Sequence, residues 1–209
     1  MKTDREYRNF KVPLEIRAAE DEMVVEGYAT TFNDPYVMAD FGDFVFSEQV
    51  DRKAFDNCDM SDVIFQYDHE GRVFARNKNK TLELTPDEKG LKVRAYLGGT
   101  DIGRQLYQEI KGGYTDKMSF GFIVAEDRTE ETNLTDKTEV LRTILSISKL
   151  YDVSAVSIPA NDATGISARN YCDGEIARIK AERLKEQEAE ETRLHKIKEL
   201  ELKMKLMEV

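Results

Sequence analysis

Several residue types and patterns are scarce in this chain of 209 residues, and each absence excludes a class of protein. Only two cysteines occur, Cys58 and Cys172, which are too few for a disulfide framework and are not spaced as metal ligands, so we expect a reducing compartment. No apolar run approaches the roughly 18 residues that span a membrane, and the N-terminal residues lack the apolar segment of a signal peptide. The sequence predicts a soluble, intracellular protein without a membrane partner.

Clusters of basic residues and the common catalytic motifs are also missing. The net charge is −10, and nucleic-acid binding needs clustered Lys and Arg for the phosphates, so the charge argues against a nucleic-acid partner and favours protein partners. The chain has no G-x-S-x-G elbow, no P-loop, no H-E-x-x-H and no G-x-G-x-x-G. The common hydrolase and nucleotide-binding folds therefore lose support, and we expect no cofactor and no metal.

Short apolar runs separated by turn signals extend from about residue 10 to about residue 168, and they predict a β-rich α+β domain. The segment Thr81–Leu97 alternates and is interrupted by Pro86–Gly90, which predicts a hairpin. The runs that we expect as strands are Met23–Phe32, Asp62–Tyr67, Thr81–Thr85, Leu91–Leu97, Met118–Ala125, Val140–Ser148 and Tyr151–Ile158.

Two helices are expected between these strands. Ser47–Asn57 has a candidate capping serine and an apolar face, and Thr100–Lys111 has apolar residues at four-residue spacing before the pair Gly112-Gly113. The polar, Thr-rich segment Glu126–Glu139 shows no periodicity and predicts an exposed connection.

The composition changes after Tyr171, and this change predicts a domain of residues 1–171 followed by a charged helical tail of residues 172–209. The tail is rich in Glu, Lys, Arg, Leu and Ala, which favour helix, but its apolar stripe is thin. A solvated helix or a weak coiled coil fits this pattern, and a tether or docking segment is the functional alternative.

Histidine narrows the search for acid–base chemistry, because the chain contains only His69 and His195. His195 lies in the charged tail, where water cannot be excluded, so we expect a surface residue there. His69 follows the strand Asp62–Tyr67, and period-two alternation places it on the side of Phe65 and Tyr67. His69 is the candidate general base.

Ser119 is the candidate nucleophile. It lies in an aromatic-rich strand beside the small Gly121, where a backbone or a substrate could approach closely. A serine hydroxyl needs an adjacent base to remove its proton, and His69 is the credible one. Ser154 and Ser157 have similar apolar surroundings, so a satisfied buried hydroxyl remains the alternative for Ser119.

A carboxylate is expected to orient the imidazole and stabilise its cation. Asp152 is the best candidate, because a carboxylate that enters an otherwise apolar strand is costly unless it is paired or well hydrogen-bonded. Asp68, Glu70 and Asp116 are alternatives near the site in sequence.

The order of these segments resembles the prohead, or capsid maturation, protease family of tailed phages. The resemblance covers Val12 to Arg169, and Met118–Phe122 together with the Val-Ser…Pro-Ala-Asn segments are its most specific parts. The segments that carry it, in order, are Glu26-Gly27-Tyr28-Ala29, Asp68-His69, Lys117–Phe122, Tyr151–Ser154 and Pro159-Ala160-Asn161.

This family is similar in fold to the herpesvirus assembly proteases, which implies a closed or nearly closed β-barrel flanked by helices. By motif it implies Ser119 as the nucleophile and His69 as the base of an acyl transfer, and it favours Asp152 as the third member. The loop after Ile158 is the expected source of the oxyanion hole by analogy with the viral relatives. The herpesvirus enzymes are activated by dimerisation, so self-association is a further expectation.

The resemblance also implies substrates and a location. The expected substrates are the major capsid protein with its scaffolding segment and the protease itself, within the prohead in the host cytoplasm. The charged tail would then target the enzyme or be removed by autoproteolysis. Two other readings remain open: a non-enzymatic internal scaffolding protein with an inert Ser119, and a cysteine hydrolase that uses Cys58.

Overall fold

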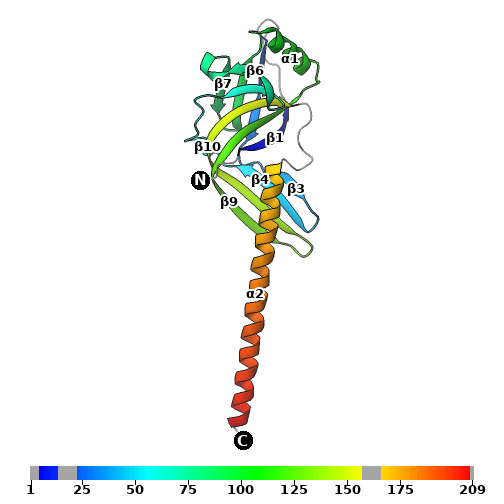
Figure 1. Ribbon diagram of the computed structural model, residues 1–209, viewed down its shortest axis with the longest axis vertical. Helices are drawn as coiled ribbons and strands as arrows, with labels where there is room; N and C mark the ends of the chain where they lie inside the picture. Colours follow the sequence, from blue (N-terminus) through cyan, green and yellow to red (C-terminus); the bar gives the residue numbers. More distant parts are fainter. Residues whose placement is uncertain (1–4, 14–22, 157–165, 208–209) are drawn as a thin grey trace. The chain divides into compact units, whose positions relative to one another are not determined.

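The structure is a computed structural model that describes residues 5–13, 23–156 and 166–207 (Figure 1). The chain divides into two compact units, Met1–Arg169 and Asn170–Val209. The strands of the described ranges belong to the first unit, and most of one long helix makes up the second. The β-rich fold class and the C-terminal helix are confirmed.

The larger sheet is built around two long antiparallel strands, β9 (Lys117–Asn133) and β10 (Thr138–Val156). Strand β10 pairs in parallel with β4 over its first half and with β5 over its second half. The sheet has seven strands, and the five others are β1 (Glu6–Pro13), β3 (Tyr36–Asp40), β4 (Phe44–Val50), β5 (Ile64–Tyr67) and β6 (Glu70–Arg76). The second half of β10 therefore lies between β9 and β5.

The smaller sheet has the order β2-β8-β7, with β2 at Val24–Thr31, β7 at Leu82–Pro86 and β8 at Gly90–Tyr96. Its β7–β8 pair confirms the predicted hairpin. An isolated bridge between Phe32 and Val50 links the two sheets. Neither sheet closes into a barrel in the part of the chain that the structure describes, so the expected herpesvirus-protease-like barrel is not confirmed.

One face of β9 is held in the core by aromatic side chains. Phe120 and Phe122 are fully buried, and their rings stack with centroids 4.3 Å apart. Each buried phenylalanine side chain contributes about 1.5–3 kcal/mol relative to an exposed one. Because side chains alternate along a strand, Ser119 and Gly121 lie on the opposite face, as the sequence predicts.

Helix α1 (Asp101–Lys111) confirms the second predicted helix. The side chain of Thr100 accepts a hydrogen bond from the Gly103 N–H at 3.1 Å, and Gly112 is the C-cap. Leu106 and Ile110 are buried. The other short helical segment is a 3-10 turn, η1 (Asn77–Asn79).

The predicted helix Ser47–Asn57 is wrong. Its first residues belong to β4, where Phe44, Phe46, Glu48 and Val50 alternate as buried residues, and turns follow as far as residue 57. Burial alternates along this strand but hydrophobicity does not, because the polar Glu48 occupies a buried position, so the sequence has no clear period of two at Ser47–Val50.

The expected exposed connection at Glu126–Glu139 is also wrong for most of its length. Strand β9 continues to Asn133 and β10 begins at Thr138, so the two strands extend as a ribbon with a short turn between them. Most of this part of β9 is exposed, so alternation of apolar and polar residues is absent from the sequence. The expected strand Val140–Ser148 and the described part of the expected strand Tyr151–Ile158, as far as Val156, are likewise one strand, β10, whose pairing shifts register at bulges. Ser157 and Ile158 lie outside the described residues.

A buried ion cluster ties β1 to the centre of the larger sheet. The carboxylate of Glu48, fully buried, accepts hydrogen bonds from Arg8 Nε at 2.6 Å, from Arg142 Nη1 at 2.8 Å and from the Tyr36 hydroxyl. Glu6 also accepts from Arg142 at 2.8 Å. Burial alone would lower the pKa of the Arg142 guanidinium, but its bonds and charge interactions with Glu6 and Glu48 raise that pKa. The sequence reading predicted neither β1 nor this cluster.

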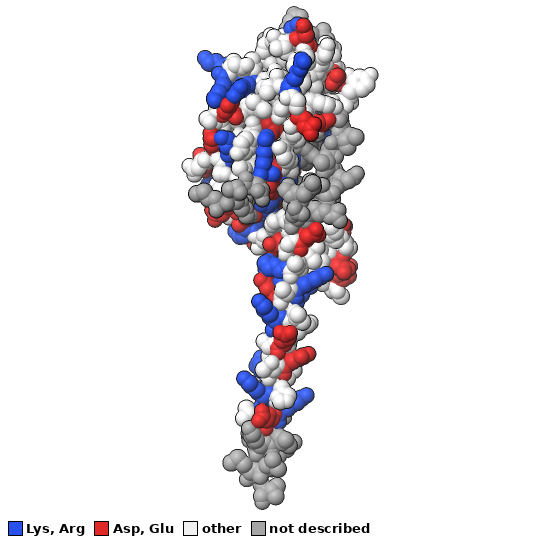
Figure 2. All heavy atoms as spheres, viewed as in Figure 1, with Lys and Arg blue, Asp and Glu red and all other residues white. Residues whose placement is uncertain are grey.

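Helix α2 (Ile166–Met207) forms most of the second unit and confirms the predicted helical tail. Basic and acidic side chains are interspersed along it (Figure 2). Arg178 pairs with Glu175 and Glu182 at i,i+3 and i,i+4 spacing, which adds a few tenths of a kcal/mol per pair. In the described ranges, no helix has the length and apolar character needed to cross a membrane.

Candidate active site

Three strands and one turn position the predicted catalytic side chains. Ser119 of β9 lies directly opposite Ser154 of β10, and Asp152 of β10 lies opposite Gly121. Ser154 in turn pairs with Gln66 of the neighbouring strand β5. Because residues paired across a sheet point to the same face, this register gathers the Ser119, Asp152 and Ser154 side chains on one surface.

His69 lies in the two-residue turn between β5 and β6. Asp68 and His69 have φ angles of +47° and +60°, the left-handed pair that a type I′ hairpin turn requires. The Asp68 N–H donates to the Ala155 carbonyl at 3.0 Å, which fixes the turn against β10. His69 contacts Asp152 and Ser154, which pair with Ile64 and Gln66 of β5 and share their face. The expectation that His69 lies on the side of Phe65 and Tyr67 is therefore wrong.

The imidazole of His69 lies between the serine and the carboxylate. Its Nε2 is in hydrogen-bond contact with Ser119 Oγ, and its Nδ1 is 2.5 Å from Asp152 Oδ1. A carboxylate beside Nδ1 is an acceptor, so Nδ1 carries the proton and Nε2 is left free to accept from the hydroxyl. The structure brings the three predicted residues together as a continuous Ser–His–Asp chain.

The carboxylate at Nδ1 belongs to Asp152, and none of the described contacts of His69 involves the alternatives Asp68, Glu70 or Asp116. Asp152 is fully buried. Its Oδ1 also accepts a hydrogen bond from Ser154 Oγ at 3.0 Å, and its Oδ2 contacts the guanidinium of Arg5. The buried charge is therefore both paired and hydrogen-bonded, as burial requires.

The hydroxyl of Ser119 is fully buried and has a second acceptor, the main-chain carbonyl of Arg8 on β1, at 2.9 Å. The hydroxyl carries one proton, so donation to Arg8 and donation to His69 are alternatives. Rotation of the O–H group about the Cβ–Oγ bond, which leaves the oxygen in place, redirects the proton from the Arg8 carbonyl to Nε2 of His69.

Two residues before or within β1 complete the surroundings. The ring of Tyr7 meets the His69 ring edge-on, with centroids 4.5 Å apart, and Arg5 lies over the rings of Tyr7 and Tyr151. Sequence reasoning missed both residues, because a short polar segment near the N-terminus has no apolar alternation that would predict a strand. The residues Arg5-Glu6-Tyr7-Arg8 show no alternation of apolar with polar types, so no sequence signal in this segment pointed to the site.

The other candidates lie away from this chain of contacts. The Cys58 thiol is partly buried, and burial raises its pKa to about 12, so almost none of it is a nucleophilic thiolate near neutral pH. His195 is an exposed residue of α2. The loop after Ile158, with Pro159-Ala160-Asn161 and the expected oxyanion hole, lies outside the described residues.

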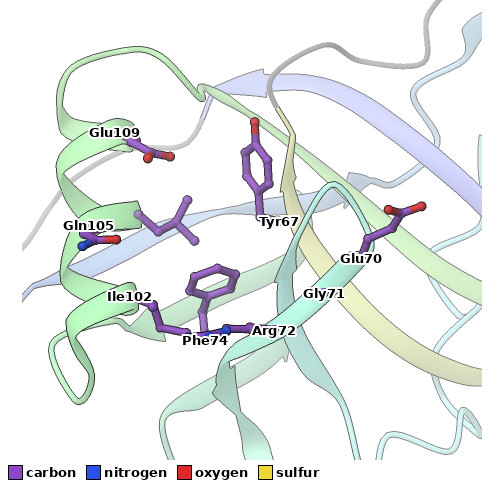
Figure 3. Close-up of a pocket in the computed structure, with 9 residues that line it drawn as sticks. Tyr67, Glu70, Gly71, Arg72, Phe74, Ile102, Gln105 and Glu109 are labelled. Atoms are coloured by element: carbon purple, nitrogen blue, oxygen red, sulfur yellow. The ribbon is translucent and has the colours of Figure 1, made fainter.

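A cavity of about 410 Å³ lies between α1 and the β5–β6 hairpin (Figure 3). Tyr67, Phe74 and Ile102 point into it, with Glu109 at its edge. Its lining contains none of the three residues of the Ser–His–Asp chain. Among the described residues, no group of three or more His, Cys, Asp or Glu side chains is placed to hold a metal ion.

Comparison with known proteins shows the family of this chain. The prohead protease of Enterobacteria phage HK97 is 30% identical over 154 residues, which cover 72% of this chain and 62% of the relative, so the chain spans less than two thirds of that protein's length. No solved structure matches significantly. The sequence model of the family described as caudovirus prohead serine protease matches residues 11–175, a range that contains Ser119, His69 and Asp152. The chain belongs to the caudovirus prohead serine protease family.

Proposed function

We propose that this chain is a serine endopeptidase of the Ser–His–Asp type that acts in prohead maturation. The observation that carries the proposal is the continuous contact from Ser119 Oγ through both nitrogens of His69 to the buried carboxylate of Asp152. Membership of the prohead protease family supports the same reading.

The proposed reaction begins with proton transfer from the Ser119 hydroxyl to Nε2 of His69. The serine oxygen attacks the carbonyl carbon of a peptide bond, and Asp152 holds the imidazole in place and stabilises its positive charge. The imidazolium then gives its proton to the leaving amine, and an acyl-enzyme forms on Ser119. Water, activated in the same way by His69, releases the carboxyl product and restores the serine.

The proposed substrates are the major capsid protein with its scaffolding segment and the protease itself, within the prohead. The name of the HK97 relative, prohead protease, supports this setting. Helix α2, largely exposed and charged, is proposed as the segment that directs the enzyme into the prohead or is removed by self-cleavage.

The test is co-expression of the full chain with its cognate capsid protein, followed by intact-mass measurement over time. Wild type and the control Ser148→Ala, which alters an exposed hydroxyl bonded to Ile123, should shorten the capsid protein at the same rate. Ser119→Ala should leave it intact. Identical fragments from Ser119→Ala and wild type would contradict the proposal, whereas an intact capsid protein with every variant would favour the scaffolding reading.

A further inference from the structure

The two oxygens of the Asp152 carboxylate have separate partners. Oδ1 contacts His69 Nδ1 at 2.5 Å and Ser154 Oγ at 3.0 Å. Oδ2 contacts Nη2 of Arg5, which lies one residue before β1. The oxygen that faces the imidazole and the oxygen that receives the guanidinium are therefore different, and the carboxylate has a defined orientation.

Arg5 supplies the counter-charge that this buried carboxylate needs. Asp152 is fully buried, and in the described residues its ion-pair partners are Arg5 and the imidazole of His69. The imidazole is neutral before it accepts the serine proton, so Arg5 is the permanent cation of this group. Removal of one partner of a buried pair leaves an uncompensated buried charge, so loss of Arg5 should displace the carboxylate.

The guanidinium is held by aromatic rings on two strands. Its central carbon lies 5.0 Å from the centroid of the Tyr7 ring and 4.5 Å from that of the Tyr151 ring. Both distances lie within the roughly 6 Å range of cation–π attraction. The rings keep Arg5 beside Asp152 although 34% of its side chain is exposed.

Gly121 provides the space in which Arg5 and Asp152 meet. A Cβ atom at this position would lie 2.5 Å from Asp152 Oδ2 and 2.9 Å from Arg5 Nε. Real Cβ contacts are longer, so any side chain at residue 121 would push the guanidinium and the carboxylate apart. The absence of a side chain at Gly121 of β9 therefore allows Arg5 and Asp152 to contact each other.

We propose that Arg5 is a positioning residue, which holds the Asp152 carboxylate turned so that Oδ1 meets His69. The proposal rests on the protease function proposed above and adds to it a group that precedes the range of the family match, residues 11–175. Arg8 lies on β1, and its buried ion pair with Glu48 anchors that strand. Because β1 pairs with β9, this anchor also fixes the position of Arg5, one residue before β1.

The experiment measures kcat and KM for cleavage of the cognate capsid protein, and the rate at which a fluorophosphonate probe labels Ser119. Arg5→Gln in the full chain should lower kcat and the labelling rate by about tenfold to a hundredfold, the loss expected for a small misplacement of a catalytic group. KM should stay within about twofold, because Arg5 acts on the imidazole through Asp152. Arg5→Lys should recover part of the rate, because it restores the charge without the planar fork.

Coupling to Asp152 separates positioning from general stability. Asp152→Asn removes the charge that Arg5 faces, so Arg5→Gln should cost little more than about twofold in that background. The control Arg128→Gln, at an exposed ion pair with Glu130, should match wild type. Thermal unfolding of each variant identifies any loss of folded protein, and Arg5→Lys keeps the test valid should Arg5→Gln unfold.

Two outcomes would overturn the inference. If Arg5→Gln cleaves at the wild-type rate while Ser119→Ala is inactive, Arg5 has no positioning role and the proposed protease function still holds. An equal loss from Arg5→Gln in the wild-type and Asp152→Asn backgrounds would show that Arg5 acts independently of Asp152. Full activity of Ser119→Ala would instead overturn the proposed function itself.

Discussion

Ser119 and Ser154 lie directly opposite each other on β9 and β10, yet they contact different nitrogens of the same imidazole. Ser119 Oγ contacts Nε2, whereas Ser154 Oγ is 3.2 Å from Nδ1 and donates to Asp152 at 3.0 Å. Only Nε2 is free to accept a proton when Nδ1–H faces a carboxylate. Ser119, which contacts Nε2, is therefore the proposed nucleophile, and Ser154, on the Nδ1 side, is a supporting residue.

This difference predicts unequal effects of two similar substitutions. Ser119→Ala should abolish cleavage, a loss of about a thousandfold or more, because no other hydroxyl contacts Nε2 among the described residues. Ser154→Ala should cost about tenfold or less, the equivalent of one hydrogen bond to Asp152. Initial rates with a common substrate measure both, and a greater loss from Ser154→Ala would reverse the assignment.

Gly121→Ala should impair activity more than folding. The new methyl group would lie 2.5 Å from Asp152 Oδ2, so we expect the carboxylate to shift from its position beside His69. Such overpacking costs about 1–3 kcal/mol of stability, and the displaced carboxylate should lower kcat by about a hundredfold. Urea unfolding and kinetics measure the two effects. The matched control is Gly174→Ala on α2, where an added Cβ has open space, and it should leave kcat unchanged.

Glu48→Gln should destabilise the first unit strongly without a direct effect on the Ser–His–Asp contacts. The substitution leaves Arg8 and Arg142 buried without the carboxylate that they share. Loss of one member of a buried ion cluster costs about 3 kcal/mol or more. The free energy of unfolding in urea is the measurement, and Glu130→Gln, at an exposed pair, is the control. A change below about 1 kcal/mol would show that the cluster is not stabilising.

Stability should decline in acid through Glu6. Burial raises the pKa of this carboxyl, but hydrogen bonds and charge from Arg142 and Arg8 outweigh it and hold the pKa below its ordinary value of 4.5. A lowered folded-state pKa means that the stabilisation is complete above 4.5 and is lost as the pH falls through the folded-state pKa. Glu6→Gln should therefore flatten the dependence of unfolding free energy on pH below 4.5. The exposed Glu83→Gln should keep the wild-type slope.

Cys58 should be dispensable. Its pKa of about 12, caused mainly by burial, leaves too little thiolate for alkylation near neutral pH. Iodoacetamide should leave the folded protein active with Cys58 unlabelled by mass spectrometry, and Cys58→Ser should cleave at the wild-type rate. Labelling after denaturation is the control for the reagent. Inactivation on modification of Cys58 would restore the cysteine hydrolase reading.

The sequence predicted best where a periodic apolar pattern coincided with a packed surface. The hairpin of β7 and β8 and the helix α1 have such patterns, and both form at nearly the predicted residues. The sequence-based prediction failed where the periodic apolar pattern was absent or short. Strand β1 and the ribbon of β9 and β10 are largely polar, and their backbone pairing stabilises them without an alternating apolar face.

The sequence by itself determined which groups were available for the chemistry. With one histidine outside the charged tail, His69 was the candidate base by elimination. Ser119 and Asp152 were candidates among alternatives, and the resemblance to the prohead proteases favoured them. Composition also determined the helical tail, because helix propensity is a local property.

Only the tertiary structure decided how these groups meet. Contacts between residues far apart in the chain set the register of β9 against β10 and place Arg5 beside Asp152. They also fix the left-handed turn at Asp68 and His69 against β10. Such contacts arise from backbone pairing and packing of the whole sheet, and local propensities do not encode them. The candidate site is therefore a property of the assembled strands.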